Sequence, residues 1–301
     1  MADDPALARV CKLYSELQPE GVDLTIDQLR QNYEVVCAHA DAPSDMVVER
    51  VDAGGVPALW VSAPGTSRDR TVVWFHSGGY LIGSAEGYAP MGYAISKAAD
   101  ARVLVVDYRL APEHAFPAPV EDAVAASRWA LTELDREGSC VIAGDSAGGG
   151  LTMATLVSLR DGGGPLPAAA VCLSGLLDLA STGDSIDERA AVDPVGSRET
   201  FDMIAQAYLQ GRCAPTEPLA SPLYAELAGL PPLLLMVGTR DVLRDDSVRM
   251  AQRYQDAGNE ARLVVEDGMV HIWPLFHRIL PAGQAGVDTI GAWVRAHTTD
   301  R

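Results

Sequence analysis

Ser146 stands within residues 144–148, which fit the pattern G-x-S-x-G. The short apolar run 140–143 precedes it, and a segment of helical composition, 151–160, follows it. A strand, a tight turn and a helix are the context in which a serine nucleophile is pushed out of a sheet. The positive end of a helix that begins at Ala147 would point toward the serine, where an oxyanion would form. The segment therefore predicts Ser146 as a nucleophile.

A serine hydroxyl needs a base to take its proton, and that base needs an acid to orient it. Asp241 follows the apolar run 233–237, and His271 follows the run 263–266, each after a short link. Both side chains would then lie at the carboxyl edge of a parallel sheet, beside Ser146. The chain order of serine, acid and histidine is that of an α/β-hydrolase.

Other residues compete for the roles of acid and base. Asp245 and Asp246 lie on the same loop as Asp241, although they could instead supply negative charge to the first turn of the following helix. Asp241 is preferred because it is nearest to the strand end. His277 is the nearest rival of His271, but it falls within a helix-like run.

Two glycines, Gly78 and Gly79, follow the apolar β-branched run 71–75. Successive glycines allow the backbone to turn its N–H groups toward a reacting carbonyl. With the N–H of Ala147, these groups predict an oxyanion hole for a tetrahedral intermediate.

Apolar runs alternate with segments of helical pattern along most of the chain, which is typical of a mainly parallel sheet with helices on both faces. The expected helices are 86–99, 121–134, 247–257 and 287–297. The expected strands are 46–51, 58–62, 71–75, 103–106, 140–143, 168–173, 233–237 and 263–266. The first two strands should form an antiparallel hairpin around the turn 53–55. We expect one α/β domain over residues 1–301, built on this eight-stranded sheet.

Two segments fall outside the alternation of strands and helices. Residues 1–42 have a helical, polar-faced pattern, with a capping box at Thr25 and Gln28. Residues 176–219 are rich in Asp, Ser and Arg and have a helical pattern at 199–209 but no strand pattern. Because this second segment lies between two expected sheet strands, it should fold above the sheet. We expect the two segments to form a helical lid.

The chain of 301 residues is acidic, with a formal net charge of −18. This charge disfavours nucleic acid and anionic membranes as partners, because both bind basic faces. No apolar run approaches the length of a membrane span, and residues 1–5 show no secretory signal. The five cysteines have no disulfide-type spacing, and no cluster has metal-ligand spacing. We expect a cytoplasmic protein with free thiols and no metal.

In its motifs the chain resembles the hormone-sensitive-lipase-like family of α/β-hydrolases, the bacterial family IV esterases. The matching segments run in family order: 76–80 (HSGGY), 108–114 (YRLAPEH), 116–118, 144–149 (GDSAGG), 221–222, 229–232, 241–245 (DVLRD) and 268–271 (GMVH). The resemblance implies an α/β-hydrolase fold with a lid and no cofactor. It also implies Ser146 as nucleophile, His271 as base and Asp241 as acid, with an oxyanion hole from Gly78, Gly79 and Ala147. Many family members are dimers, so a homodimer is expected.

Several residues around these motifs have further expected roles. Ser77 and the pair Ile272 and Trp273 depart from the glycines and phenylalanine usual in the family. Tyr80, Ile272 and Trp273 are expected to contact the substrate. Arg109 and Glu113 are expected to form a buried ion pair below the site, and Asp145 to tie the turn at Ser146 to neighbouring backbone.

Together these features predict a serine carboxylesterase that acts on short- to medium-chain esters through an acyl-serine intermediate. A lactonase that opens cyclic esters, such as terpene-derived lactones, would use the same groups and stays open as an alternative. A non-catalytic small-molecule binder on the same fold, as in the plant gibberellin receptors that resemble this family, is a second alternative. Such a binder usually lacks a triad residue, above all the histidine, and here all three positions are filled.

Overall fold

A computed structural model describes residues 4–19, 22–39, 42–133 and 138–299. Its scaffold is an eight-stranded sheet in the order β1-β2-β4-β3-β5-β6-β7-β8. The pairs β1–β2 and β2–β4 are antiparallel, and the other five pairs are parallel. The strands are β1 Val47–Asp52, β2 Pro57–Ser62, β3 Thr71–Phe75, β4 Arg102–Val106, β5 Cys140–Asp145, β6 Ala169–Leu173, β7 Leu233–Gly238 and β8 Ala261–Glu266.

The inner strands β3, β5, β6 and β7 are buried at every position, whereas β1 and β8 at the two edges are largely open to solvent. Continuous apolar runs are what parallel strands covered on both faces require. The predicted mostly parallel α/β sheet is therefore confirmed. Each expected strand is present, although β5 runs on to Asp145 and β8 already begins at Ala261.

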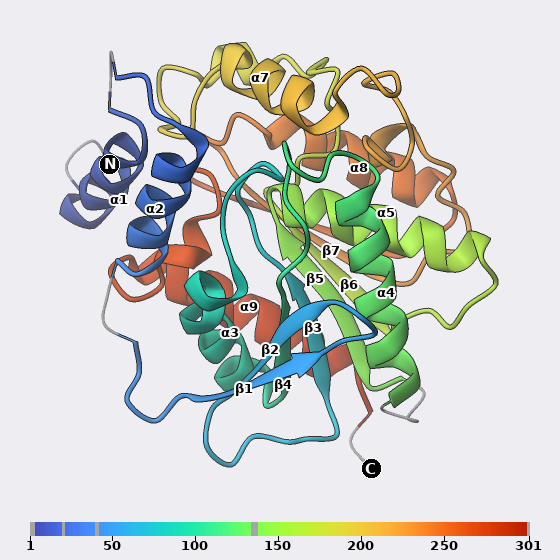
Figure 1. Ribbon diagram of the computed structural model, residues 1–301. Helices are drawn as coiled ribbons and strands as arrows, with labels where there is room; N and C mark the ends of the chain where they lie inside the picture. Colours follow the sequence, from blue (N-terminus) through green and yellow to red (C-terminus); the bar gives the residue numbers. More distant parts are fainter. Residues whose placement is uncertain (1–3, 20–21, 40–41, 134–137, 300–301) are drawn as a thin grey trace.

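Helices cover both faces of the sheet (Figure 1). Helices α3 and α9, joined by α1 and α2, share one apolar core with the sheet, and α4, α5 and α8 share the other. The bounds are α1 Pro5–Leu17, α2 Ile26–Cys37, α3 Ala85–Ala99, α4 Ala118–Glu133, α5 Ala147–Asp161, α8 Arg244–Asp256 and α9 Pro281–His297. Helix α9 begins at Pro281 rather than at residue 287, because proline is well tolerated in a first helical turn.

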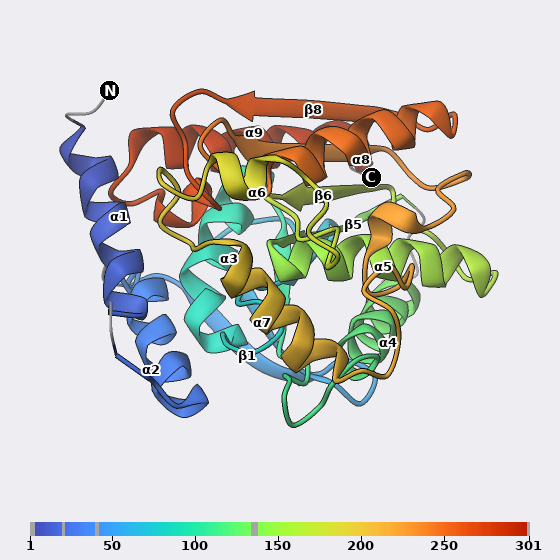
Figure 2. The same cartoon turned by 90° about the horizontal axis from the view of Figure 1, so that it is seen from above.

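The two segments expected to form a lid lie at the rim of this scaffold. Thr25 and Gln28 form the predicted capping box at the start of α2. The segment between β6 and β7 contains α6 Ser185–Glu188, α7 Arg198–Leu209 and the 3-10 turn η1 Pro222–Tyr224, and no strand. Both views place α7 above the sheet, with α1 and α2 side by side at its flank (Figures 1 and 2). Residues 1–3, 20–21 and 40–41 of the expected lid lie outside the described residues, as does residue 134, the expected end of α4.

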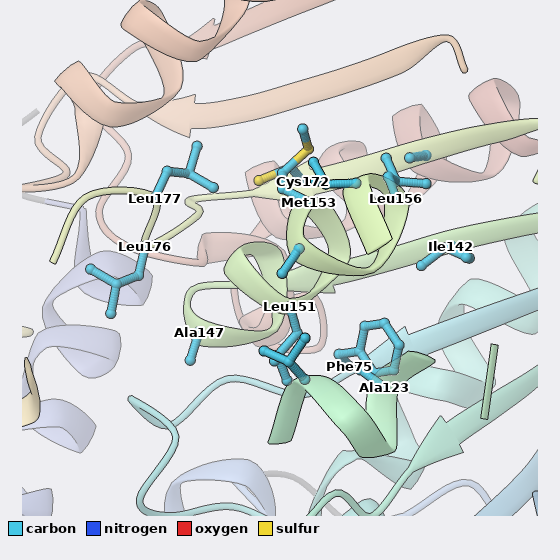
Figure 3. Close-up of a cluster of buried hydrophobic side chains, with 14 of the residues drawn as sticks. Phe75, Ala123, Ile142, Ala147, Leu151, Met153, Leu156, Cys172, Leu176 and Leu177 are labelled. Carbon is cyan, nitrogen blue, oxygen red and sulfur yellow. The ribbon is translucent and has the colours of Figure 1, made fainter. Parts of the chain in front are cut away.

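Helix α5 is held against the sheet by apolar packing (Figure 3). Leu151 and Leu156 on α5 belong to the same buried cluster as Phe75 of β3 and Ile142 of β5. Burying each such side chain stabilises the fold by roughly 1.5–3 kcal/mol. The first residue of this well-anchored helix is Ala147, so the preceding residue has a defined position. No described helix is both long enough and apolar enough to cross a membrane.

Candidate active site

Ser146 lies on the turn between β5 and α5, with φ 53° and ψ −118°. This is an unfavourable backbone conformation for a residue with a side chain, and such strain is common at functional turns. Glycines make the turn possible: a Cβ at Gly148 would overlap the carbonyl oxygen of Phe75, and one at Gly144 would overlap that of Gly148. The predicted tight turn with its flanking glycines is thus present at Ser146.

His271 and Asp241 form a buried pair. The Nδ1 atom of His271 lies 3.1 Å from Oδ1 and 3.3 Å from Oδ2 of Asp241. Oδ1 of Asp241 also accepts a hydrogen bond of 2.9 Å from the N–H of Leu243. A carboxylate in this position fixes the orientation of the imidazole and leaves Nε2 as the nitrogen that can take a proton.

The end of β6 connects the serine turn with the loop that carries His271. The N–H of Ser146 donates to the carbonyl of Leu173 at 2.9 Å. The next residue, Ser174, accepts at its Oγ a hydrogen bond of 3.1 Å from the N–H of Ile272. Since Ser146, Asp241 and His271 follow the parallel strands β5, β7 and β8, all three lie at the carboxyl edge of the sheet.

Gly78 and Gly79 follow β3 with positive φ angles of 118° and 61°. Side chains are strained at such angles, which accounts for glycine at both positions. Within the described chain, the N–H groups of Gly78, Gly79 and Ala147 donate to no protein acceptor. These donors are therefore free to bind an oxygen of a substrate.

Comparison with known proteins identifies the fold and the family. Residues 72–275 match a family model described as the alpha/beta hydrolase fold. The chain is 41% identical over 256 residues to an acetyl-hydrolase of Streptomyces hygroscopicus, covering 85% of this chain and 84% of that protein. It is 35% identical over 224 residues to the carboxylesterase NlhH of Mycobacterium tuberculosis, covering 70% and 68%.

The solved structures give the same answer. A crystal structure of an esterase from the bacterial hormone-sensitive lipase family superposes on the chain with a TM-score of 0.95, at 45% identity, covering 99% of both chains. The chain belongs to the bacterial hormone-sensitive lipase family of α/β-hydrolases. The family expected from the motifs is confirmed.

Ser77, which departs from the usual glycine of this hormone-sensitive lipase family, links the loop after β3 to two helices. Its Oγ hydrogen-bonds the hydroxyls of Tyr33 on α2 and Tyr88 on α3. The Tyr88 hydroxyl donates to Asp145 at 2.6 Å, and Trp74 Nε1 donates to the same carboxylate at 3.0 Å. Asp145 therefore ties the turn to neighbouring side chains, and the expectation of a backbone partner was wrong. Burial outweighs these hydrogen bonds and raises the pKa of Asp145 to about 6.

The three residues expected to contact substrate have different surroundings in this family member. The ring of Tyr80 stacks on Tyr208 of α7, with centroids 3.9 Å apart. Ile272 is buried with φ 43° beside the proposed base. The indole of Trp273 donates to the carbonyl of Ala282 in α9 at 3.2 Å. Trp273 is thus packed toward α9 in the core, whereas Tyr80 lies between the glycine loop and α7.

Arg109 and Glu113 do not form the expected buried ion pair. Arg109 binds Asp122 on α4 at 2.8 Å and Glu121 at 3.2 Å, while Glu113 binds Arg30 on α2 at 2.7 Å. Both side chains are almost half exposed. The expectation was wrong because α4 and α2 each bring an oppositely charged group closer than the partner along the chain.

The two rival acids, Asp245 and Asp246, bind the segment between β6 and β7, and neither forms a hydrogen bond with the imidazole of His271. Asp245 accepts a hydrogen bond from the N–H of Ser185 at 3.0 Å. Asp246 accepts one from the N–H of Leu177 at 3.0 Å and pairs with Arg249 at 2.8 Å. Both residues lie in the first turn of α8, as expected for that alternative role.

One buried acid escaped the sequence analysis. Asp193 lies between α6 and α7 and is 4% exposed. One ligand atom each from Asp193, Asp241 and His271 lie within 4.8 Å of one another. Nothing in an Asp-rich segment marks this residue, because its burial depends on contacts with the loop after β7. The two carboxylates also accept backbone hydrogen bonds, Asp193 from Val242 and Asp241 from Leu243.

The carboxylates around His271 change its affinity for a proton. Burial disfavours the charged imidazolium, but attraction by Asp241 and the hydrogen bond to it outweigh burial, with smaller contributions from Asp193 and Asp145. The pKa of His271 is therefore raised above its ordinary value. A base with a raised pKa takes the proton of a serine hydroxyl more readily.

Proposed function

We propose that this protein is a serine carboxylesterase that cleaves short- to medium-chain carboxylic esters through an acyl-serine intermediate. Ser146 attacks the ester carbonyl while His271 takes its proton and then returns it to the leaving alcohol. Asp241 holds the imidazole, and water releases the acid in the second half of the reaction. The free N–H groups of Gly78, Gly79 and Ala147 would stabilise the oxyanion of each tetrahedral intermediate.

The observation that carries this proposal is the buried pair of His271 and Asp241, at the same sheet edge as the strained turn of Ser146. A purely structural histidine would not need both a carboxylate on one nitrogen and a serine on a strained turn at the same edge of the sheet. The names of the relatives, acetyl-hydrolase and carboxylesterase, support ester hydrolysis as the reaction class.

The contacts of helix α7 favour substrates with a short acyl chain. A Cβ at Gly79 would lie 2.9 Å from Cδ1 of Ile204, so the side chain of Ile204 covers the glycine loop. Beside it, Tyr208 stacks on Tyr80 and meets the edge of Phe116. We propose that residues 1–301 form a single domain and that residues 1–42 and 176–219 form its lid. Helix α7 belongs to this lid and would limit the length of the acyl chain.

The test is hydrolysis of p-nitrophenyl esters from acetate to palmitate, with Ser146→Ala as the control variant. Turnover that is highest for short chains and is lost in the variant would support the proposal. Turnover that persists in folded Ser146→Ala would overturn the role of Ser146. No turnover of any ester by the folded wild-type protein would favour the small-molecule binder instead.

Lactones belong in the same assay, because a lactonase would use the same nucleophile, base and oxyanion hole on a cyclic ester. Ring opening faster than hydrolysis of every linear ester would assign the protein as a lactonase. We also propose that the protein is a cytoplasmic homodimer. All five cysteines are free, which is consistent with a reducing compartment. Analytical ultracentrifugation tests the dimer.

A further inference from the structure

Asp193 connects the proposed lid with the loop that carries the proposed acid. Its Oδ2 accepts a hydrogen bond of 2.9 Å from the N–H of Val242, the residue directly after Asp241. Its Oδ1 accepts a weaker one of 3.2 Å from the N–H of Val195. With its side chain within 4.8 Å of both Asp241 and His271, Asp193 is a second carboxylate beside the imidazole, and it comes from a different part of the chain.

Charged and titratable groups lie near this carboxylate on several elements: Arg240 and Asp241 after β7, Cys11 and Tyr14 on α1, and His271. Arg240 donates to the carbonyl of Val192 at 2.8 Å. Arg189, on the same segment as Asp193, approaches Glu188 at 3.8 Å, and its Nε has no hydrogen-bond partner among the described residues. In the part of the chain that the structure describes, no Arg or Lys forms an ion pair with Asp193.

Two buried carboxylates without an Arg or Lys partner are unfavourable unless a cation forms between them. The imidazole of His271 can become that cation. It does so when it takes the proton of Ser146, so the positive charge develops during the reaction and disappears when the proton passes to the leaving alcohol.

We propose that Asp193 is a positioning residue, supplied by the lid segment, that stabilises the protonated form of His271 together with Asp241. The inference rests on the proposed function, since it assigns His271 as the base. Its consequence is that the basicity of His271 depends on the lid: when residues 176–219 move away from the site, the second negative charge leaves with them. By linkage, protonation of His271 strengthens the docking of this segment.

The pKa shifts of Asp193 and His271 agree with the short distance between their side chains. Burial is the main cause that raises the pKa of Asp193 above its ordinary value, with repulsion by Asp241 next and attraction by His271 opposing it. The pKa of His271 is raised in turn, with Asp193 among the causes. Groups that interact this strongly share their protons and titrate as one unit.

The decisive variant is Asp193→Asn, which removes the charge but keeps an oxygen that can accept the hydrogen bond from Val242. We expect the acid limb of kcat/KM for p-nitrophenyl acetate to move by about one unit toward lower pH, since a nearby opposite charge shifts a pKa by roughly this amount or more. Asp202→Asn is the matched control, because it removes the same charge from an exposed position on α7. The control should leave the limb in place.

A second measurement does not depend on turnover. In protein carrying Ser146→Ala, the ring-proton resonance of His271 is titrated by NMR with and without Asp193→Asn, and we expect a lower midpoint with it. The inference would be overturned if neither the acid limb of kcat/KM nor the midpoint of the His271 titration shifted and only the plateau rate fell. Asp193 would then serve only to hold the backbone N–H of Val242. If the proposed function itself is wrong, the wild-type protein will show no turnover of p-nitrophenyl acetate.

If Asp193→Asn does not fold, the wild-type titration decides between the two views. Two inflections in the His271 resonance that both persist in Asp145→Asn, one from the ring and one from the coupled carboxyl group of Asp193, support the inference. A single inflection overturns it.

Discussion

The hydroxyl of Tyr14, in the first helix of the chain, donates a hydrogen bond of 3.2 Å to the backbone carbonyl of His271. Both residues are almost fully buried, and the ring of Tyr14 meets Phe276 edge-on at 5.4 Å. Helix α1 therefore contacts the loop that carries the proposed base, from the opposite end of the sequence.

Replacing Tyr14 with phenylalanine tests the strength of this contact. The Tyr14→Phe variant leaves a buried carbonyl without its donor, so we expect the free energy of unfolding to fall by about 1 kcal/mol. Urea denaturation measures the change. Tyr93→Phe is the control, because the Tyr93 hydroxyl donates to Asp45 in an exposed position and its loss should change stability far less. Equal losses in both variants would contradict a specific role for the Tyr14 contact.

The role of Asp241 can be separated from that of its neighbour Asp245. Asp241→Asn removes the carboxylate that orients His271, and we expect kcat to fall by roughly four powers of ten. Asp245→Asn should change kcat much less, because Asp245 binds the N–H of Ser185 instead. Steady-state kinetics of both variants with one ester decide the point. A larger loss in Asp245→Asn would reassign the acid.

Activity should decrease toward acid pH with a midpoint above that of an ordinary histidine. His271 must be neutral to accept the proton of Ser146, and protonation removes the base as the pH falls through its pKa. Because Asp241 raises that pKa despite burial, the acid limb of kcat/KM should lie above about pH 6.5. A pH profile of kcat/KM measures it. A limb below that pH would mean that the carboxylate does not control the imidazole.

The loop of Gly78 and Gly79 can be probed with a matched pair of glycine variants. Gly79 and Gly163 have similar φ angles of 61° and 65°, but only at Gly79 would a Cβ meet another group, Ile204. We expect Gly79→Ala to lower kcat by roughly a hundredfold, because it displaces a proposed oxyanion donor. Gly163→Ala should lower only stability, through its strained backbone.

A double variant sharpens the test of this loop. Ile204→Ala removes the side chain that the new Cβ would meet, so the double variant Gly79→Ala with Ile204→Ala should recover part of the lost kcat. Kinetics of the two single variants and the double variant give the coupling between them. If the effects of the two substitutions on kcat were additive, the side chain of Ile204 would not be in contact with the glycine loop.

The position of the candidate site could be predicted because its residues follow the strands directly. Ser146, Asp241 and His271 each come shortly after an apolar run that predicts a strand, and parallel strands end at the same edge of a sheet. The structural role of the glycines after β3 and around Ser146 could also be predicted from the local sequence. Each adopts a backbone angle or a close contact that a side chain would prevent.

Contacts between distant segments could not be read in this way. Arg109 and Glu113 carry opposite charges four positions apart, yet each binds a helix that the chain brings in from elsewhere. The partners of Asp145 are likewise two side chains from β3 and α3 rather than nearby backbone. Charge and spacing along the chain do not reveal which oppositely charged or polar group lies nearest in space.

The sequence by itself determined the mostly parallel α/β sheet and the candidate residues at the strand ends, because hydrophobic period and glycine geometry are local properties. Its motifs carried the resemblance to the hormone-sensitive lipase family. Only the tertiary structure decided that Asp193 lies beside Asp241 and His271, and that Tyr14 reaches the His271 loop. Burial and electrostatic coupling are properties of neighbours in space, and here those neighbours come from segments that are far apart in the chain.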